Sequence, residues 1–345
     1  MKEKIMTLAQ VEALQIEQGR KMFSAQHEEI VQGATTDVYF VKTQEILAKC
    51  GLKDTVVTAE VFARRDGILA GLPEVLALFE NCEVKVWSLQ EGQSFKAKEV
   101  IMRIQGKYTD FGIYETALLG IMASSSGWAT AAREAKEAAG DKLVLCFGAR
   151  HVHPAVAPVM ERAAIIGGAD GASCILGAKL AGREPSGTVP HAIFLIMGDS
   201  VKVAKAYHEF MPSGEPRTVL VDTFKDEAEE TLRVAEALGS DLQGIRLDTP
   251  SERGGVNTEL IKEIRARLDQ KSFSHVKIFV SGGLSPERIK LLKEAGADAF
   301  GVGSHISAAS PIDMTMDIKE VAGQPIAKRG RIPGITPNER LVKMT

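Results

Sequence analysis

Seven polar residues in the second half of the chain each follow a short apolar run, at the point where a β-strand is expected to end. Successive members lie 20 to 33 residues apart, enough for a strand, a loop, a helix and a return loop. This spacing predicts repeated β/α units around a parallel sheet. In an α/β barrel the carboxyl ends of the strands meet at one mouth, where active sites lie. The seven residues are Arg150, Asp170, His191, Asp222, Asp248, Ser281 and Ser304.

The expected fold is of the α/β class, an incomplete barrel of about seven strands with an N-terminal α+β domain. We assign residues 1–113 to the N-terminal domain and residues 114–310 to the barrel, and we expect residues 311–345 to pack back on the N-terminal domain. Hydrophobic periodicity predicts helices over 36–51, 114–140, 155–166, 173–181, 199–210, 226–238, 257–270 and 286–295, and two antiparallel β runs within 83–107.

Composition excludes several classes of protein. The net charge of −3 over 345 residues has no basic stripe, which argues against a nucleic-acid partner. No apolar run reaches the roughly 18 residues that a membrane-spanning helix needs, and the N-terminus MKEKIMTLAQ lacks the apolar stretch of a secretory signal, so we expect a cytoplasmic protein. The four cysteines form no CxxC pair, which predicts reduced thiols and no zinc knuckle.

Two glycine-rich segments end the last two expected strands. They are SGGL, with Ser281, Gly282 and Gly283, and GVGS, with Gly301, Gly303 and Ser304. Glycine lets backbone N–H groups approach a phosphate closely, and the helix expected after SGGL begins where its dipole favours an anion. The segments therefore predict a phosphate site, although simple glycine turns remain the alternative. Neither has the spacing of a P-loop.

Two carboxylates and an arginine follow neighbouring strands. Asp222 and Asp248 each end an apolar run, and Arg246 precedes Asp248 by two residues on the same strand face. A carboxylate at a barrel mouth can hold Mg²⁺, bind sugar hydroxyls or stabilise a developing cation. The alternative is a helix N-cap, since Asp-Thr precedes a helix in both places. His191 is either a catalytic residue or a core or capping histidine.

Phe147 and Arg150 are spaced so that a flat ring and a guanidinium could meet one ligand. Such a pair suits an aromatic acid or a phosphate. His151 and His153 could chelate a metal, but no third ligand lies at a suitable spacing, and a loop role is favoured. No lysine ends any of the expected strands, which disfavours Schiff-base chemistry.

The motifs occur in a characteristic order: TTDVY, FGARHVHP, GGADGAS, GTVPHAIF, VLVDTF, GIRLDTP, VSGGL and FGVGS. Over about residues 30 to 306 this series resembles the nicotinate phosphoribosyltransferase family and the related nicotinamide phosphoribosyltransferases. The resemblance implies transfer of phosphoribose from phosphoribosyl pyrophosphate to nicotinate, giving nicotinate mononucleotide and pyrophosphate. It also implies Mg²⁺, a homodimer or larger homo-oligomer with shared active sites, and ATP coupling of a ligase type.

The resemblance assigns each site residue a role. Phe147 would stack on the pyridine ring, and Tyr39 of a neighbouring subunit would close its other face. Arg150 and Arg246 would bind phosphate or the polar group of the base, whereas Asp222 and Asp248 would bind ribose and Mg²⁺-pyrophosphate. The segments SGGL and GVGS would hold the 5′-phosphate. His191 would be the histidine that ATP phosphorylates.

Asp170 would face the base, where a carboxylate accepts from a carboxamide but repels an acid, so the resemblance leaves nicotinate and nicotinamide open. A quinolinate phosphoribosyltransferase is a second enzyme hypothesis, although the Arg and Lys expected around a dicarboxylate are not evident. A non-catalytic phosphate-binding barrel protein is the hypothesis from another class. A flavin oxidoreductase would explain the glycine segments but leave TDVY and FGAR without a role.

Overall fold

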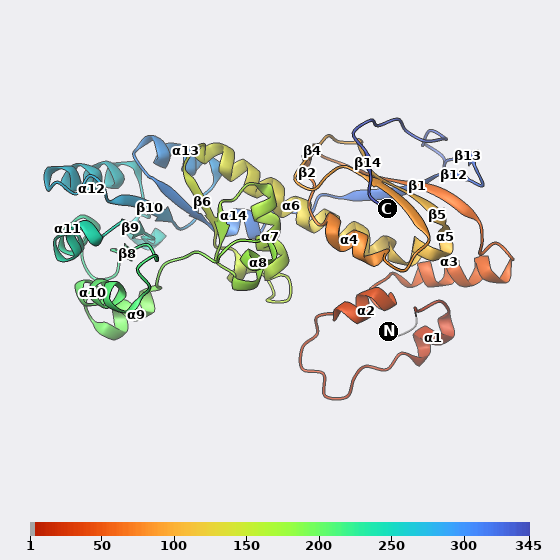
Figure 1. Ribbon diagram of the computed structural model, residues 1–345, viewed down its shortest axis with the longest axis horizontal. Helices are drawn as coiled ribbons and strands as arrows, with labels where there is room; N and C mark the ends of the chain where they lie inside the picture. Colours follow the sequence, from red (N-terminus) through yellow and green to blue (C-terminus); the bar gives the residue numbers. More distant parts are fainter. Residues whose placement is uncertain (1–3) are drawn as a thin grey trace. The chain divides into compact units, whose positions relative to one another are not determined.

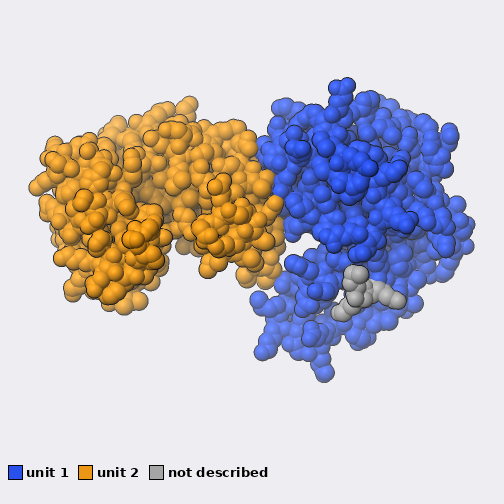
Figure 2. All heavy atoms as spheres, in the orientation of Figure 1, with its two compact units in different colours: residues 1–129, 310–345 blue, residues 130–309 orange. Residues whose placement is uncertain are grey.

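The computed structural model describes residues 4–345, which divide into two compact units (Figures 1 and 2). The first unit comprises residues 1–129 and 310–345, and the second comprises residues 130–309. The long helix expected over 114–140 is present as α6 (Glu115–Ala139), which contributes residues to both units.

The first unit is built on an antiparallel sheet. At its centre, Val61 of β1 lies opposite Met102 of β5 and Met316 of β12. In spatial order the strands are β13 (Gln324–Pro325), β12 (Met314–Val321), β1 (Val56–Ala63), β5 (Val100–Lys107), β3 (Val84–Ser88) and β14 (Val342–Lys343), and β2 (Gly67–Ile68) pairs with β4 (Ser94–Phe95). The antiparallel pairing of β3 with β5 confirms the two β runs expected within 83–107.

Helices cover this sheet through a shared apolar core. Its fully buried members include Val61 and Ile104 from the sheet, Val75 from α4, and Leu118 and Met122 from α6. The helices of the unit are α1 (Leu8–Ala13), α2 (His27–Gln32), α3 (Val38–Lys49), α4 (Leu72–Leu78), α5 (Tyr108–Phe111) and the 3₁₀ turn η1 (Gly112–Tyr114), together with the first part of α6. The helix expected over 36–51 is thus confirmed as α3.

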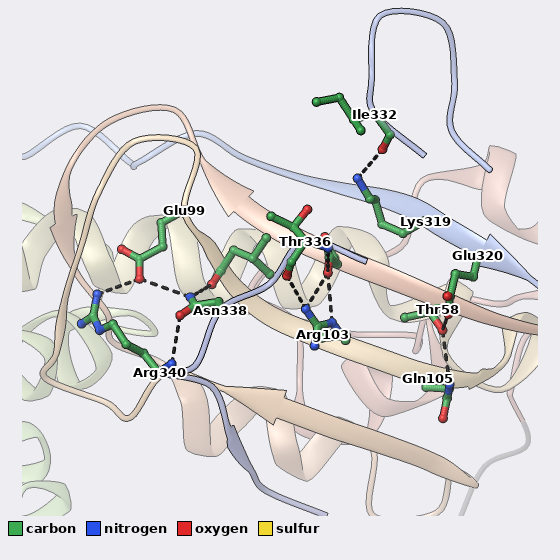
Figure 3. A network of polar contacts seen from close by, with 12 residues as sticks. Thr58, Glu99, Arg103, Gln105, Lys319, Glu320, Ile332, Thr336, Asn338 and Arg340 are labelled. Atoms are coloured by element: carbon green, nitrogen blue, oxygen red, sulfur yellow. Dashed lines mark hydrogen bonds and ion pairs between the residues drawn. The ribbon is translucent and has the colours of Figure 1, made fainter. Parts of the chain in front are cut away.

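The C-terminal segment is fastened to the sheet by side chains from β1 and β5 (Figure 3). Glu60 is almost fully buried, and its carboxylate accepts two hydrogen bonds from Arg103, at 2.9 and 2.8 Å. The same two residues hold Thr336, whose N–H donates to Glu60 and whose carbonyl accepts from Arg103. Further along, Arg340 forms an ion pair with Glu99.

The second unit contains a parallel sheet. Its strands are β6 (Leu143–Cys146), β7 (Gly171–Ala172), β8 (Thr218–Leu220), β9 (Gly244–Leu247), β10 (Lys277–Ser281) and β11 (Ala299–Val302), in the spatial order β7-β6-β11-β10-β9-β8. The first and last of them in the chain, β6 and β11, are neighbours, and β7 and β8 form the edges. The mixed α/β class is therefore confirmed. The described sheet has six strands, because residues 186–190 before His191 are extended without strand pairing.

Helices alternate with these strands, as the periodicity predicts. They are α7 (Ala157–Gly167), α8 (Ile175–Leu180), α9 (His191–Met197), α10 (Ser200–Phe210), α11 (Glu227–Leu238), α12 (Thr258–Gln270), α13 (Pro286–Glu294) and α14 (Ser304–Ser307), with 3₁₀ turns η2 (Ala149–His151), η3 (Gly239–Asp241) and η4 (Ser251–Arg253). Four begin at side-chain N-caps, namely Asp199, Asp226, Asn257 and Ser285. Helices α10 to α13 pack side by side outside the strands (Figure 1).

The remaining expectations concern thiols and membranes. All four cysteines are free thiols, as expected, and Cys146, the last residue of β6, is buried. Over residues 4–345, no helix is long and apolar enough to cross a bilayer.

The Glu60–Arg103 pair yields a stability prediction. Replacing Arg103 with Met leaves a buried carboxylate with only the Thr336 N–H as a partner, and we expect a loss of about 3 kcal/mol in the free energy of unfolding. The control is Arg340→Met, which removes an exposed ion pair and should cost no more than about 1 kcal/mol. Urea unfolding monitored by circular dichroism measures both. Equal losses in the two variants would contradict the assignment of Glu60 and Arg103 as the main fastening.

Candidate active site

The carboxyl ends of β6, β9, β10 and β11 surround a cavity of about 380 Å³ in the second unit. Ten of the site residues expected from the sequence line it: Phe147, Arg150, Arg246, Asp248, Ser281, Gly282, Gly283, Gly301, Gly303 and Ser304. Residues separated by about 150 positions thus meet in one place because parallel strands present their carboxyl ends together.

Arg246 is the centre of the hydrogen bonding in this cavity. Its Nε donates to Ser281 Oγ at 2.9 Å, Nη1 donates to Thr188 Oγ1 at 2.9 Å and Nη2 donates to Asp248 Oδ2 at 3.1 Å. These three acceptors come from β10, from the segment before α9 and from the end of β9. The guanidinium therefore has one orientation before any ligand binds.

Two aromatic rings lie close to the same guanidinium. The Arg246 Cζ atom lies 5.2 Å from the ring centroid of Phe147 and 5.9 Å from that of Phe279. Burial lowers the pKa of Arg246, and the Asp248 and Asp222 carboxylates oppose that shift. The cavity thus contains a partly desolvated cation whose charge is balanced by carboxylates, next to the face of an aromatic ring.

Asp248 is held from two sides. Ser281 is buried, and its Oγ donates to Asp248 Oδ1 at 2.9 Å while it accepts from Arg246. Gly282 has a φ of +90°, and a Cβ there would lie 3.1 Å from Asp248 Oδ1. A side chain at this position would therefore press on the carboxylate. The Ser281 hydroxyl links the two charged groups, and only the backbone of SGGL is left for a ligand.

The two glycines of β11 and its following loop make room for side chains of the β6 loop. A Cβ at Gly301 would lie 2.6 Å from the ring of Phe147, and one at Gly303 would lie 2.8 Å from Cε1 of His151. Both distances are shorter than real Cβ contacts. Glycine at these positions is therefore required for Phe147 and His151 to reach their places in the cavity wall.

The two histidines of FGARHVHP have different surroundings. His151 lines the cavity, and its Nδ1 lies 3.0 Å from Ser307 Oγ on α14. The Nδ1 of His153 accepts from the N–H of Ala155, which closes a local turn, and the residue is not part of the cavity wall. Among residues 4–345, no group of three or more His, Cys, Asp or Glu side chains could hold a metal ion.

His191 and Asp222 form a pair of their own. His191 is the first residue of α9, and its Nε2 lies 3.1 Å from Asp222 Oδ1. The Asp222 side chain is fully buried, and burial raises its pKa despite the neighbouring imidazole. Its Oδ2 has no hydrogen-bond partner within the protein. Neither residue lines the cavity around Arg246.

Asp170 and Tyr39 lie elsewhere. Asp170 precedes β7, so it stands at the amino end of that strand, where it accepts from Lys136 Nζ and from the N–H of Val144, both at 2.8 Å. The apolar run before Asp170 is the end of α7, and this is why the motif was expected to follow a strand. Asp170 is not brought to the cavity. Tyr39 belongs to the first unit and is half-exposed on α3.

Four cavity residues were not singled out from the sequence. They are Ala149, Ser173, Gly187 and Thr188. Each lies within a motif that drew attention for another residue: Ala149 precedes Arg150, Ser173 ends GGADGAS, and Gly187 and Thr188 open GTVPHAIF. Only their place within these motifs could have indicated them from the sequence, because small side chains are common in all parts of a protein.

Comparison with known families identifies what this cavity belongs to. Residues 37–126 match the N-terminal domain of quinolinate phosphoribosyl transferase, and residues 128–317 match the C-terminal domain of the same family. The chain belongs to the quinolinate phosphoribosyl transferase family. The cavity described above falls within the second of these two matches.

The chain is similar to two nicotinate-nucleotide pyrophosphorylases and also to a nicotinate phosphoribosyltransferase. The crystal structure of nicotinate-nucleotide pyrophosphorylase from Pyrococcus furiosus is 46% identical, with a TM-score of 0.88, and the match covers 92% of this chain and 82% of that one. A probable nicotinate-nucleotide pyrophosphorylase (carboxylating) from Methanothermobacter thermautotrophicus is 23% identical over 77% of this chain and 90% of its own length. The nicotinate phosphoribosyltransferase of Bacillus subtilis is 28% identical over 79% of this chain, which spans only 63% of its length.

The family assignment made from the motifs is therefore wrong. The two domain matches and the Pyrococcus furiosus structure overturn membership of the nicotinate phosphoribosyltransferase family, and with it nicotinate as the accepting base. The expected ATP coupling, ligase-type reaction and phosphorylation of His191 are overturned by the same matches. The Bacillus subtilis match shows that this chain is also similar to a protein of that other family, at 28% identity.

The close approach at Gly301 yields a prediction for the cavity. Gly301→Ala places a methyl group 2.6 Å from the Phe147 ring, so the ring must shift from its present place beside Arg246. We expect kcat/KM for phosphoribosyl transfer to fall by about 100-fold, because a small displacement of a positioning group lowers the rate strongly. The protein should remain folded. Steady-state kinetics and circular dichroism measure the two effects. Unchanged kinetics would show that the position of Phe147 does not matter.

The buried carboxylate of Asp222 yields a pH-dependent prediction. Because its pKa is raised above the usual value of 3.8, the fold favours the protonated form, and ionisation costs stability as the pH rises above about 4. Asp222→Asn cannot ionise, so the variant should gain stability relative to the parent protein as the pH increases from 4 to 7. Urea unfolding at a series of pH values measures this, with the exposed Asp241→Asn as control. A difference that shrinks with rising pH would refute it.

Proposed function

We propose that this chain transfers phosphoribose from phosphoribosyl pyrophosphate to the ring nitrogen of quinolinate, with release of pyrophosphate and CO₂, to give nicotinate mononucleotide. The observation that carries the proposal is the cavity in which Arg150 and Arg246 lie beside the Phe147 ring and the Asp248 carboxylate, above two glycine-rich strand ends. The names of the Pyrococcus furiosus and Methanothermobacter thermautotrophicus relatives support the same reaction, written in reverse as a carboxylating pyrophosphorylase.

The binding roles follow from charge and shape. Quinolinate carries two carboxylates on a flat ring, and Arg150 with Arg246 supplies two guanidinium groups next to an aromatic side chain. The guanidinium of Arg246 is already oriented by its three hydrogen bonds, so little freedom is lost when the base binds. The backbones of Gly282 and Gly283, at φ values of +90° and +58°, and of Gly301 to Ser304 would receive the 5′-phosphate.

The reaction proceeds in two bond changes. The ring nitrogen forms a bond to C1′ of the ribose while the bond from C1′ to the pyrophosphate oxygen breaks, and the leaving pyrophosphate carries away that electron pair. The bond from ring carbon 2 to its carboxylate then breaks, CO₂ departs, and the electron pair left beside the cationic nitrogen takes a proton. Asp248 would stabilise the positive charge that develops on the ribose, and the cations of the cavity would hold the carboxylates in place.

A divalent cation fits this cavity as a partner of the pyrophosphate. No three-ligand protein cluster exists among residues 4–345, so protein side chains alone would not hold the ion. Asp248 lines the cavity, so its carboxylate is suited to complete the coordination, whereas Asp222 is fully buried outside the cavity wall. Bound Mg²⁺ would neutralise the leaving pyrophosphate.

The sheet of the second unit is proposed to be an incomplete seven-part barrel. The pairing of β6 with β11, the first and last strands, supports a closed order, and β7 and β8 are the only edges of the described sheet. Residues 186–190 lie between β7 and β8 in the chain, and Gly187 and Thr188 of this segment line the cavity. In the proposed barrel this segment occupies the seventh position, although it does not pair as a strand. A homo-oligomer in which Tyr39 reaches a second copy's site remains part of the proposal.

The proposal is tested with purified protein, phosphoribosyl pyrophosphate and Mg²⁺. Quinolinate labelled with ¹⁴C in its 2-carboxylate should release labelled CO₂ and form nicotinate mononucleotide, and ATP should not change the rate. Asp248→Asn should lower kcat by about 100-fold or more, because it removes the charge opposite the ribose, whereas the exposed Asp241→Asn should not. Turnover of nicotinate or nicotinamide in place of quinolinate, or no turnover at all, would refute the proposal.

A further inference from the structure

One buried carboxylate beneath the cavity has no role in the reaction described above. Glu161 lies on α7 and is fully buried. Its Oε1 accepts from the N–H of Ala149 and from Ser173 Oγ, both at 3.1 Å, and its Oε2 accepts from the N–H of Cys174 at 2.5 Å. Three donors thus converge on a single side chain.

These donors belong to two different loops of the cavity. Ala149 begins the 3₁₀ turn η2 after β6, and the same turn carries Arg150 and His151. Ser173 and Cys174 follow β7 and lead into α8. Ala149 and Ser173 both line the cavity, so Glu161 joins the loop that presents Arg150 to the wall facing it.

Burial of the Glu161 carboxylate costs free energy that a purely structural site would not require. Burial raises the pKa of its carboxyl, and the hydrogen bonds from Cys174, Ala149 and Ser173 oppose that shift without cancelling it. An apolar side chain of similar size would fill the same space without the cost of desolvating a charge. Packing alone therefore does not explain a carboxylate here, whereas two loops that each need an acceptor do.

The surrounding packing gives the carboxylate little freedom. A Cβ at Gly177 of α8 would lie 3.1 Å from Cβ of Glu161, so the two helices are in direct contact. A Cβ at Gly148 would lie 2.7 Å from Cε of Met160, the residue before Glu161. Helix α7 thus stands directly behind both loops, and a shift of its side chains would be transmitted to them.

We propose that Glu161 is a positioning residue that fixes the Arg150 loop against the Ser173 wall and thereby shapes the part of the cavity that receives the pyridine carboxylates. This inference rests on the proposed function, and it assigns the recognition of the base to a group that does not contact it. Arg150 and Arg246 are close enough for their charges to repel. A loop carrying one of them needs a fastening, and the anion beneath it provides one.

The bonding pattern determines which variants are informative. Glutamine has the shape of glutamate but only one acceptor oxygen, so Glu161→Gln can satisfy either Ala149 with Ser173 or Cys174, but not all three. Glu161→Asp keeps the charge but is one methylene shorter and cannot reach both loops at once. The matched control is Glu230→Gln on α11, because Glu230 is also fully buried and pairs with Arg233 away from the cavity.

The first test is kinetic. Glu161→Gln should raise KM for quinolinate by about tenfold, as expected for the loss of one charge-assisted hydrogen bond, while kcat changes by less than about threefold. Glu230→Gln should leave both parameters unchanged, even if its melting temperature falls by as much as that of Glu161→Gln. An unchanged KM in Glu161→Gln, or an equal rise in Glu230→Gln, would overturn the proposal.

The second test needs no turnover. Amide hydrogen exchange at Ala149 and Cys174 should become faster in Glu161→Gln and Glu161→Asp, and it should stay unchanged in Glu230→Gln. If the parent protein does not convert quinolinate, the proposed function fails, but the exchange measurement still decides whether Glu161 orders the two loops. Equal exchange in the parent protein and in both Glu161 variants would overturn the positioning role.

Discussion

The cavity depends on one buried cation. Arg246 reaches it from β9 close to the rings of Phe147 and Phe279, and it donates to three acceptors from three different segments. A desolvated guanidinium is costly unless each donor is satisfied and its charge is balanced. The requirement for balance explains why a carboxylate, Asp248, stands two residues further along the same strand. The buried Ser281 hydroxyl contacts both charged groups, since it accepts from Arg246 and donates to Asp248.

The two aspartates near Arg246, Asp248 and Asp222, have different surroundings. Asp248 shares hydrogen bonds with Arg246 and Ser281 and remains partly open to the cavity, whereas Asp222 is fully buried beside His191, with a raised pKa. The two carboxylates therefore differ in burial and in their hydrogen-bond partners. Asp248 lines the cavity, and in the proposed reaction it would act on the ribose. Asp222 lies outside the cavity wall, and its Oδ2 has no hydrogen-bond partner within the protein.

The sequence was sufficient for the features that depend on local pattern. Periodicity located α3, α6, α7 and α10 to α13, and the end of each run before Arg150, Asp248 and Ser281 located the cavity. Prediction from the sequence failed where one apolar pattern can belong either to a strand or to another structure. The apolar run before Asp170 is the end of a helix, so that residue lies at the amino end of β7, and the run before His191 does not pair as a strand. Whether an extended segment pairs depends on its neighbours in the sheet, which no local pattern contains.

The same limit explains why the family was misassigned. In the proposed reaction the glycine-rich ends and Asp248 act on the phosphate and the ribose, which are the part of the substrate that all phosphoribosyltransferases share. In the proposed reaction the accepting base is bound by Arg150 and Arg246, and the loop that carries Arg150 is joined to the loop that carries Ser173 by the buried Glu161. Those loops are positioned by tertiary hydrogen bonds between residues that look ordinary in the sequence. Under the proposed function, the glycine-rich strand ends and Asp248 therefore indicate the phosphoribosyl half of the reaction, whereas the choice of base depends on tertiary contacts such as those of Glu161.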